Sequence, residues 1–145
     1  MEDTYLKIYF AGSIRGSEPD REWFQQLIQY IKQYAKVMTE HSFDFSYENE
    51  IKKDDTGIYT TDMAWLMKSD VLIAEVTAPS LGVGYEIAKA ETWGLPVLLL
   101  YRESLNRAPS AILNGNKNLH MIKYNEKPEV FKAIAEFIEA LRLDA

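Results

Sequence analysis

Two segments of the sequence have residue types that suit the binding of a small anion. The first, residues 12–16 (GSIRG), offers permissive backbone, one hydroxyl and one guanidinium within five residues. The second places Ser80, Gly82 and Gly84 at the predicted start of a helix, where free amides and the helix dipole favour negative charge. A phosphate is the natural ligand. However, GSIRG matches neither GxGxxG nor a P-loop, and a glycine turn with a surface arginine is the simpler alternative.

Two carboxylates, Asp62 and Glu86, and the phenol of Tyr9 could do chemistry beside such an anion. Glu86 lies just inside the helix that follows Ser80, and Asp62 falls on another predicted helix beside Trp65. Each has a simpler explanation: Glu86 complements the positive helix end, Asp62 is solvated, and Tyr9 belongs to the core. They gain weight if the fold brings them together, because two carboxylates facing a bound sugar are the groups that cleave a glycosidic bond.

The elements that must position these residues alternate between strands and helices along the chain. Apolar runs bounded by turn residues predict strands, and apolar residues spaced by three or four predict helices. The predicted strands span 6–11, 36–39, 71–76, 96–101 and 119–123. The predicted helices run over 19–34, from Asp55 or Thr56 through Leu66, from the glycine-rich turn at 77–84 to about Trp93, over 109–113 and over 130–141. A polar loop, 42–55, precedes the helix that carries Asp62.

This alternation predicts an α/β fold, a three-layer doubly wound sandwich around a five-stranded parallel sheet. The expected strand order is the flavodoxin-like 2-1-3-4-5, with the continuously apolar strand 96–101 at the sheet centre. In that order the winding reverses between the first and third strands, so a ligand should bind at the loops after Ala11 and Val76. Those loops are the two anion-binding segments, which favours a functional role for both.

Composition narrows the classes of function. The 145 residues are expected to form one domain, 1–145. Sixteen Lys and Arg against 22 Asp and Glu give a net charge of −6, so neither a nucleic-acid polymer nor a membrane is expected as a partner. With no cysteine and two histidines, we expect neither thiol catalysis nor a metal, and no cofactor. The start, Met-Glu-Asp-Thr, lacks the order of a secretory signal, and we expect a cytoplasmic protein.

Three other protein classes with this topology lack their chemistry in this sequence. A phospho-receiver domain needs an acidic pair after the first strand and an aspartate after the third, where this chain has Gly-Ser and Thr-Ala. A flavodoxin needs a hydroxyl-rich loop after the first strand, and GSIRG has one hydroxyl. A low-molecular-weight tyrosine phosphatase needs a cysteine nucleophile. None of the three fits.

Five strings, spread over most of the chain, carry a family resemblance. They are Tyr9 to Gly16 (YFAGSIRG), Thr39 to His41 (TEH), Asp62 to Leu66 (DMAWL), Ala74 to Glu86 (AEVTAPSLGVGYE) and Ser110 to Ile112 (SAI). In these strings the sequence resembles the nucleoside 2-deoxyribosyltransferase superfamily, and most closely its 2'-deoxynucleoside 5'-monophosphate N-glycosidase (Rcl-like) branch. The string that ends in Glu86 is the most specific of the five.

The resemblance implies roles for individual residues. Glu86 would attack the anomeric carbon to give a covalent glycosyl-enzyme intermediate, and Asp62 would protonate the leaving base or help to activate water. Tyr9 would hydrogen-bond Glu86, hold its rotamer and keep it ionised at neutral pH. The implied substrate-binding residues surround the phosphate and sugar, with the histidine nearer the base. They are Gly12, Ser13, Ile14, Arg15, His41, Ser80, Gly82, Ser110, Ala111 and Ile112.

The resemblance also implies a substrate and an assembly. The chain would hydrolyse a 2'-deoxynucleoside 5'-monophosphate, a small-molecule deoxynucleotide, as a homodimer in which the Ser110 segment completes the neighbour's phosphate pocket. Arg15, Ser80 and Ser110 match the branch that reads the phosphate. Two alternatives stay open: a nucleoside 2-deoxyribosyltransferase that exchanges bases, and a nucleotide-binding sensor without turnover. Loop 42–55 borders the expected base pocket and carries none of the five matching strings, which leaves base preference open, with a purine favoured only by analogy.

Overall fold

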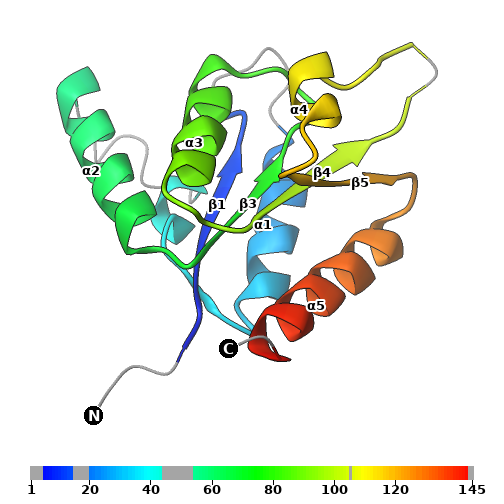
Figure 1. Ribbon diagram of the computed structural model, residues 1–145, viewed down its shortest axis with the longest axis horizontal. Coiled ribbons are helices and arrows are strands. Elements are labelled where there is room, and N and C mark those ends of the chain that lie inside the picture. The colour runs from blue at the N-terminus through cyan, green and yellow to red at the C-terminus, as the bar shows by residue number, and fades with distance from the viewer. Residues whose placement is uncertain (1–4, 15–19, 44–53, 105, 144–145) are drawn as a thin grey trace.

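The computed structural model describes residues 5–14, 20–43, 54–104 and 106–143, and places a parallel sheet between two layers of helices (Figure 1). The described strands are β1 (Lys7–Gly12), β2 (Lys36–Val37), β3 (Val71–Glu75), β4 (Val97–Arg102) and β5 (His120–Tyr124). The described helices are α1 (Arg21–Ile31), α2 (Asp55–Lys68), α3 (Leu81–Thr92), α4 (Ala111–Gly115) and α5 (Lys127–Leu143), with a 3-10 helix, η1 (Glu40–Phe43). The strand order is β2-β1-β3-β4-β5 and every pairing is parallel, which confirms the predicted fold and order.

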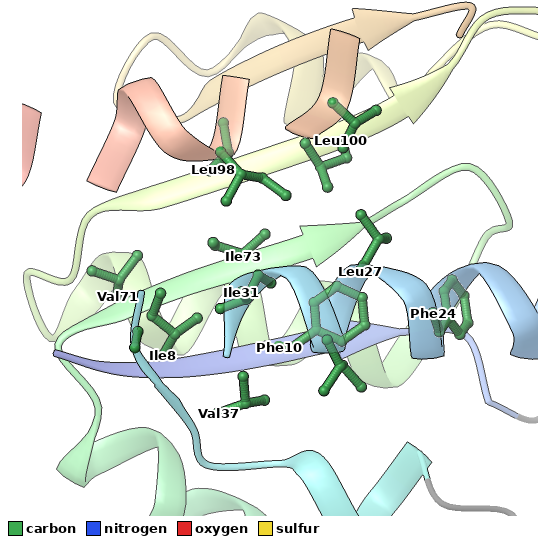
Figure 2. Packing of buried hydrophobic residues seen from close by; sticks show 14 of the residues in the cluster. Ile8, Phe10, Phe24, Leu27, Ile31, Val37, Val71, Ile73, Leu98 and Leu100 are labelled. Atoms are coloured by element: carbon green, nitrogen blue, oxygen red, sulfur yellow. The ribbon is translucent and has the colours of Figure 1, made fainter. Parts of the chain in front are cut away.

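One face of the sheet packs against α1 and α5 (Figure 2). Ile8 and Phe10 of β1 point to this face, because alternate side chains of a strand share a face. Leu27 and Ile31 of α1, four residues apart on one side of their helix, belong to the same buried cluster as these strand residues. Burial of such large apolar side chains is the main stabilising contribution to this layer.

The opposite face carries Tyr9 and packs against α2 and α3, which Figure 1 shows on the other side of the sheet from α1 and α5. Leu66 of α2 and Ile87 of α3 are buried there together with Tyr9. Consecutive residues of β1 therefore serve different layers, with Phe10 in the first core and Tyr9 in the second. Among the helices of the described ranges, none is both long and apolar enough to cross a membrane.

The second strand is shorter than the predicted 36–39. The Thr39 side chain takes over the pairing with β1: its Oγ1 accepts from the Phe10 amide at 3.1 Å and donates to the Phe10 carbonyl at 2.6 Å. The backbone at Thr39 is thereby released from the ladder, and the chain turns into η1. The expected loop 42–55 is wrong at both ends, because Ser42 and Phe43 belong to η1 and Asp55 to α2, while 44–53 lie outside the described residues.

Helix ends and strand position also differ from expectation. The side chain of Asp54, not of Asp55 or Thr56, caps α2 by accepting from the Gly57 amide at 2.8 Å. The helix expected at 109–113 begins after its cap Ser110, and the final helix begins at Lys127 rather than at 130. The helix expected over 19–34 covers only Arg21–Ile31, with Pro19 outside the described residues. The central strand is β3, so the strand expected at the sheet centre, β4, lies one position away from it. β4 is nonetheless continuously apolar, because helices cover both of its faces.

Candidate active site

The carboxyl ends of β1 and β3 meet at the point where the winding of the sheet reverses. Gly12 at the end of β1 pairs in register with Glu75 at the end of β3, so the loops that follow both strands leave the sheet side by side. In a doubly wound sheet this edge is where ligands bind. The observed switch point therefore lies between the two strands after which the sequence predicts the site. Arg15 and Gly16, in the first of these loops, lie outside the described residues.

Glu86 is held over this edge by the way α3 begins. The Ser80 hydroxyl caps the helix by accepting from the Val83 amide at 3.2 Å, and Glu86 follows in the second turn. Its Oε2 accepts a hydrogen bond from the hydroxyl of Tyr9, whose side chain is 1% exposed. The rigid strand β1 thus fixes the orientation of the carboxylate. This is the contact that the resemblance implies.

The environment of Glu86 opposes its ionisation. The pKa of Glu86 is raised to about 7: burial raises it most, the hydrogen bond from Tyr9 lowers it, and the negative charge of Asp62 raises it. Burial also raises the pKa of Tyr9, with further increases from the charges of Glu86 and Asp62, so its hydroxyl stays a donor. Tyr9 acts in the expected direction, but burial outweighs it. The expectation that Tyr9 keeps Glu86 ionised at neutral pH stays a prediction.

Asp62 completes the cluster from α2. This helix packs against both β1 and α3, and the rings of Tyr59 and Tyr85 meet between the two helices with centroids 6.4 Å apart. Asp62 is half-buried, and its charge acts on the pKa of both Tyr9 and Glu86. The three residues predicted to do the chemistry therefore converge, although they come from three separate elements. Two nearby carboxylates, one with a raised pKa, can divide the roles of nucleophile and proton donor.

The two glycines predicted to bind substrate have different structural settings. A Cβ at Gly12 would lie 2.9 Å from Cζ of Phe24, so packing against the α1 layer itself demands glycine there. At Gly82, the nearest described atom to such a Cβ would be the Ser80 Oγ, at 4.0 Å. The packing of the described chain thus does not require glycine at 82. Close approach of a ligand to the first turn of α3 remains a reason for it.

The remaining predicted binding residues lie directly after β1, on η1 and at the start of α4. Ser13 is buried directly after β1, whereas the side chain of Ile14 packs against the α1 and α5 core. His41 is exposed on η1, which Thr39 ties to β1. Ser110 caps α4, and Ala111 and Ile112 after it are exposed. The Ser110 segment is therefore free of the core and accessible to another molecule.

Sequence reasoning missed one buried carboxylate, Glu75, which lies at the same edge with 3% of its surface exposed. The signal was an ionisable residue within the apolar run VLIAEV, which a buried strand tolerates only when hydrogen bonds satisfy it. No three His, Asp or Glu residues of the described chain are grouped closely enough to hold a metal ion.

This sheet, with a hydrogen-bonded carboxylate beside its switch point, defines a doubly wound α/β protein with a candidate active site. The family model described as nucleoside 2-deoxyribosyltransferase matches residues 8–128, and the chain belongs to this family. A protein of Danio rerio named 5-hydroxymethyl-dUMP N-hydrolase is 39% identical over 140 residues, covering 94% of this chain and 98% of that protein. A protein of Esox lucius with the same name is 38% identical over 145 residues, covering 96% and 100%.

A bacterial relative and a solved structure extend this comparison. A protein of Syntrophotalea carbinolica with the provisional name 2'-deoxynucleoside 5'-phosphate N-hydrolase 1 is 34% identical over 139 residues, covering 95% of this chain and 98% of its own. The structure of the Clostridium botulinum CMP N-glycosidase BcmB superposes with a TM-score of 0.62 over 90% of this chain and 98% of that one. At 23% sequence identity, that likeness supports the fold alone.

Proposed function

We propose that this protein hydrolyses the N-glycosidic bond of 2'-deoxynucleoside 5'-monophosphates to a free base and 2-deoxyribose 5-phosphate. The observation that carries the proposal is the hydrogen bond from Tyr9 to Glu86, beside Asp62 at the switch point of the sheet. The names of relatives that align over nearly the whole chain support the substrate class, and 5-hydroxymethyl-dUMP is a specific candidate within it.

The proposed reaction has two displacements at the anomeric carbon. When the reaction starts, the carboxyl pair holds one proton, on Asp62, and Glu86 is ionised. The carboxylate of Glu86 attacks C1', the bond from C1' to the base nitrogen breaks, and Asp62 gives its proton to the leaving base. A water then attacks C1', Asp62 takes its proton, and the ester bond to Glu86 breaks to regenerate the carboxylate. Tyr9 holds Glu86 in one rotamer through both steps and keeps more of it ionised than burial alone would allow.

The 5'-phosphate is proposed to bind between the two loops at the edge of the sheet. The first turn of α3, with Ser80 and Gly82, presents amide groups and the positive end of a helix of 12 residues. Arg15 is proposed to supply the charge that distinguishes a nucleotide from a nucleoside. If so, Arg15→Ala should weaken the binding of a deoxynucleotide far more than that of the matching nucleoside, and equal losses would refute that role.

A homodimer is proposed to complete the site, with Ser110 of each chain reaching the phosphate of the other. Two apolar side chains near the edge are almost fully exposed in the single chain, Leu81 at 97% and Ile112 at 83%. Exposed apolar residues of this size mark surfaces that associate with other molecules. Light scattering during gel filtration should give twice the chain mass, and Leu81→Lys together with Ile112→Lys should give the monomer with loss of nucleotide turnover.

Incubation with dGMP, dAMP, dCMP, dTMP and 5-hydroxymethyl-dUMP, followed by chromatography of the free bases, tests the function directly. Release of base from at least one nucleotide supports hydrolysis, and release from none contradicts it. Adding a second base and finding a new nucleoside or nucleotide would instead support the transferase after which the family is named. Glu86→Gln should abolish turnover and keep ligand binding. A sensor would show binding without turnover in the unmodified protein.

The expectations that the protein needs no metal and that it is cytoplasmic stay predictions.

A further inference from the structure

Glu75 is a buried carboxylate that the proposed reaction does not use. It ends β3, and both of its oxygens are occupied by donors. Oε1 accepts from the Thr77 amide at 2.8 Å, and Oε2 accepts from the Thr77 hydroxyl at 2.9 Å and from the hydroxyl of Tyr124. Burial raises the pKa of Glu75, whereas these hydrogen bonds and the charge of Arg102 oppose that effect. Two of the three donors lie on Thr77, in the loop that leads to α3.

The hydroxyls of Thr77 and Tyr124 both donate to Glu75, and this direction follows from the second group that each hydroxyl binds. The Thr77 hydroxyl already accepts from the Arg102 amide at 2.9 Å, and the Tyr124 hydroxyl accepts from Nε1 of Trp23 at 2.8 Å. An amide and an indole nitrogen can only donate, so both hydroxyls must direct their own protons to Glu75. Glu75 therefore serves as an acceptor for three donors. A glutamine in its place would turn an amide group against one or more of them.

Arg102 extends this network to the residue that precedes α1. Its backbone amide binds Thr77, and its Nη2 lies 3.0 Å from Oδ2 of Asp20. Thr77 precedes the helix cap Ser80 by three residues, roughly 10 Å of chain at most. The first turn of α3 is thus tied, within a few residues, to this set of hydrogen bonds.

We propose that Glu75 is a positioning residue for phosphate recognition, which acts through Thr77 to set the position of the first turn of α3, where the 5'-phosphate binds. The inference rests on the proposed function only in assigning the phosphate to this turn. Glu75 touches neither the sugar nor the base in this scheme. Disturbing the network should therefore weaken the binding of a nucleotide and spare the binding of the matching nucleoside.

The test compares the binding of dTMP and thymidine by calorimetry in a Glu86→Gln background, where neither ligand is turned over. Thr77→Val keeps the shape and the amide but removes the hydroxyl, and Glu75→Gln keeps the shape but replaces one acceptor oxygen by an NH2 donor. Each should weaken dTMP about tenfold or more and change thymidine by no more than about twofold. Thr77→Ser retains the hydroxyl and should keep the dTMP affinity.

Ile134→Ala supplies the control for stability, because Ile134 is fully buried in the core on the α1 and α5 face. It should lower the melting temperature at least as much as Thr77→Val and leave the ratio of the two affinities unchanged. Equal weakening of dTMP and thymidine by the loop variants, or no weakening, would overturn the inference. So would a parent protein that binds dTMP no better than thymidine. A protein that prefers dTMP but releases no base contradicts the proposed reaction alone.

Discussion

Removing the Tyr9 hydroxyl tests whether Glu86 acts as an ionised nucleophile. In the unmodified protein the pKa of Glu86 is about 7, with the Tyr9 hydrogen bond holding it below the value that burial would give. A nucleophile must be ionised, so kcat/KM should rise with pH and reach half its limit near pH 7. Tyr9→Phe removes the donor and keeps the buried ring, and the half-limit should then move to higher pH.

The size of the move follows from the strength of the lost interaction. A hydrogen bond to a charged group contributes about 1.5–3 kcal/mol, and about 1.4 kcal/mol corresponds to one pH unit. The pKa of Glu86 in Tyr9→Phe should therefore lie at roughly 8 to 9. At pH 7 the variant should retain about a tenth or less of the ionised carboxylate, and raising the pH should restore much of the activity.

The assay combines kinetics with a direct titration. The pH dependence of kcat/KM reports the free enzyme, and the 13C chemical shift of the Glu86 carboxyl, assigned with Glu86→Gln, reports its ionisation without turnover. Tyr101→Phe is a matched control, because Tyr101 is buried and its hydroxyl has no hydrogen-bond partner among the described residues. An activity that does not rise as the pH approaches 7 would contradict an ionised Glu86 nucleophile and refute the reasoning. So would a Tyr9→Phe profile that coincides with that of Tyr101→Phe.

Two further predictions concern stability. Because the folded pKa of Glu86 lies above its ordinary 4.5, the folded state binds more protons than the unfolded state between about pH 4.5 and 7, and this group makes the protein less stable as the pH rises through that window. Glu86→Gln should therefore be more stable than the parent at pH 8, by up to about 3 kcal/mol, and similar to it at pH 4, as urea unfolding can measure; an equal difference at both pH values would contradict the pKa. Gly12→Ala should lose about 1–3 kcal/mol because its Cβ meets Phe24, whereas Gly82→Ala should lose no stability and weaken dTMP binding. Thermal unfolding measures the loss of stability, and calorimetry measures the affinity for dTMP. A destabilised Gly82→Ala would show that packing, not ligand binding, requires glycine at this position.

The strand order and its switch point could be predicted from sequence because both follow from apolar periodicity and from the handedness of crossovers. The alternation in β1 and the apolar run of β4 were sufficient signals, and the switch point followed from the order. The boundary of β2 could not be predicted. It depends on the Thr39 hydroxyl replacing a backbone hydrogen bond to Phe10, a choice that only the neighbouring strand determines.

The candidate site shows a similar division. Glu86 and Tyr9 were identifiable by resemblance, but the raised pKa of Glu86 comes from burial by neighbouring layers, which sequence spacing does not express. The network around Glu75 could not be predicted from sequence, because its partners Thr77, Arg102 and Tyr124 come from separate parts of the chain. Gly12 was assigned to the phosphate, yet its contact with Phe24 gives a packing reason for glycine there that could not be separated from a binding reason by sequence.

The alternation of Tyr9 and Phe10 along β1 makes the length of this strand as important as its composition. Loss or gain of one residue before Tyr9 that shifted the strand in its register would exchange the two faces, placing Phe10 or Ile8, according to the direction of the shift, under Glu86 and a phenol in the apolar core. A single substitution in β1 changes the contacts of one side chain. Such a shift would instead disrupt the packing of both faces and remove the hydrogen-bond donor of Glu86 at the same time. During divergence of related sequences, insertions and deletions should accordingly be confined to the loops and spare this strand.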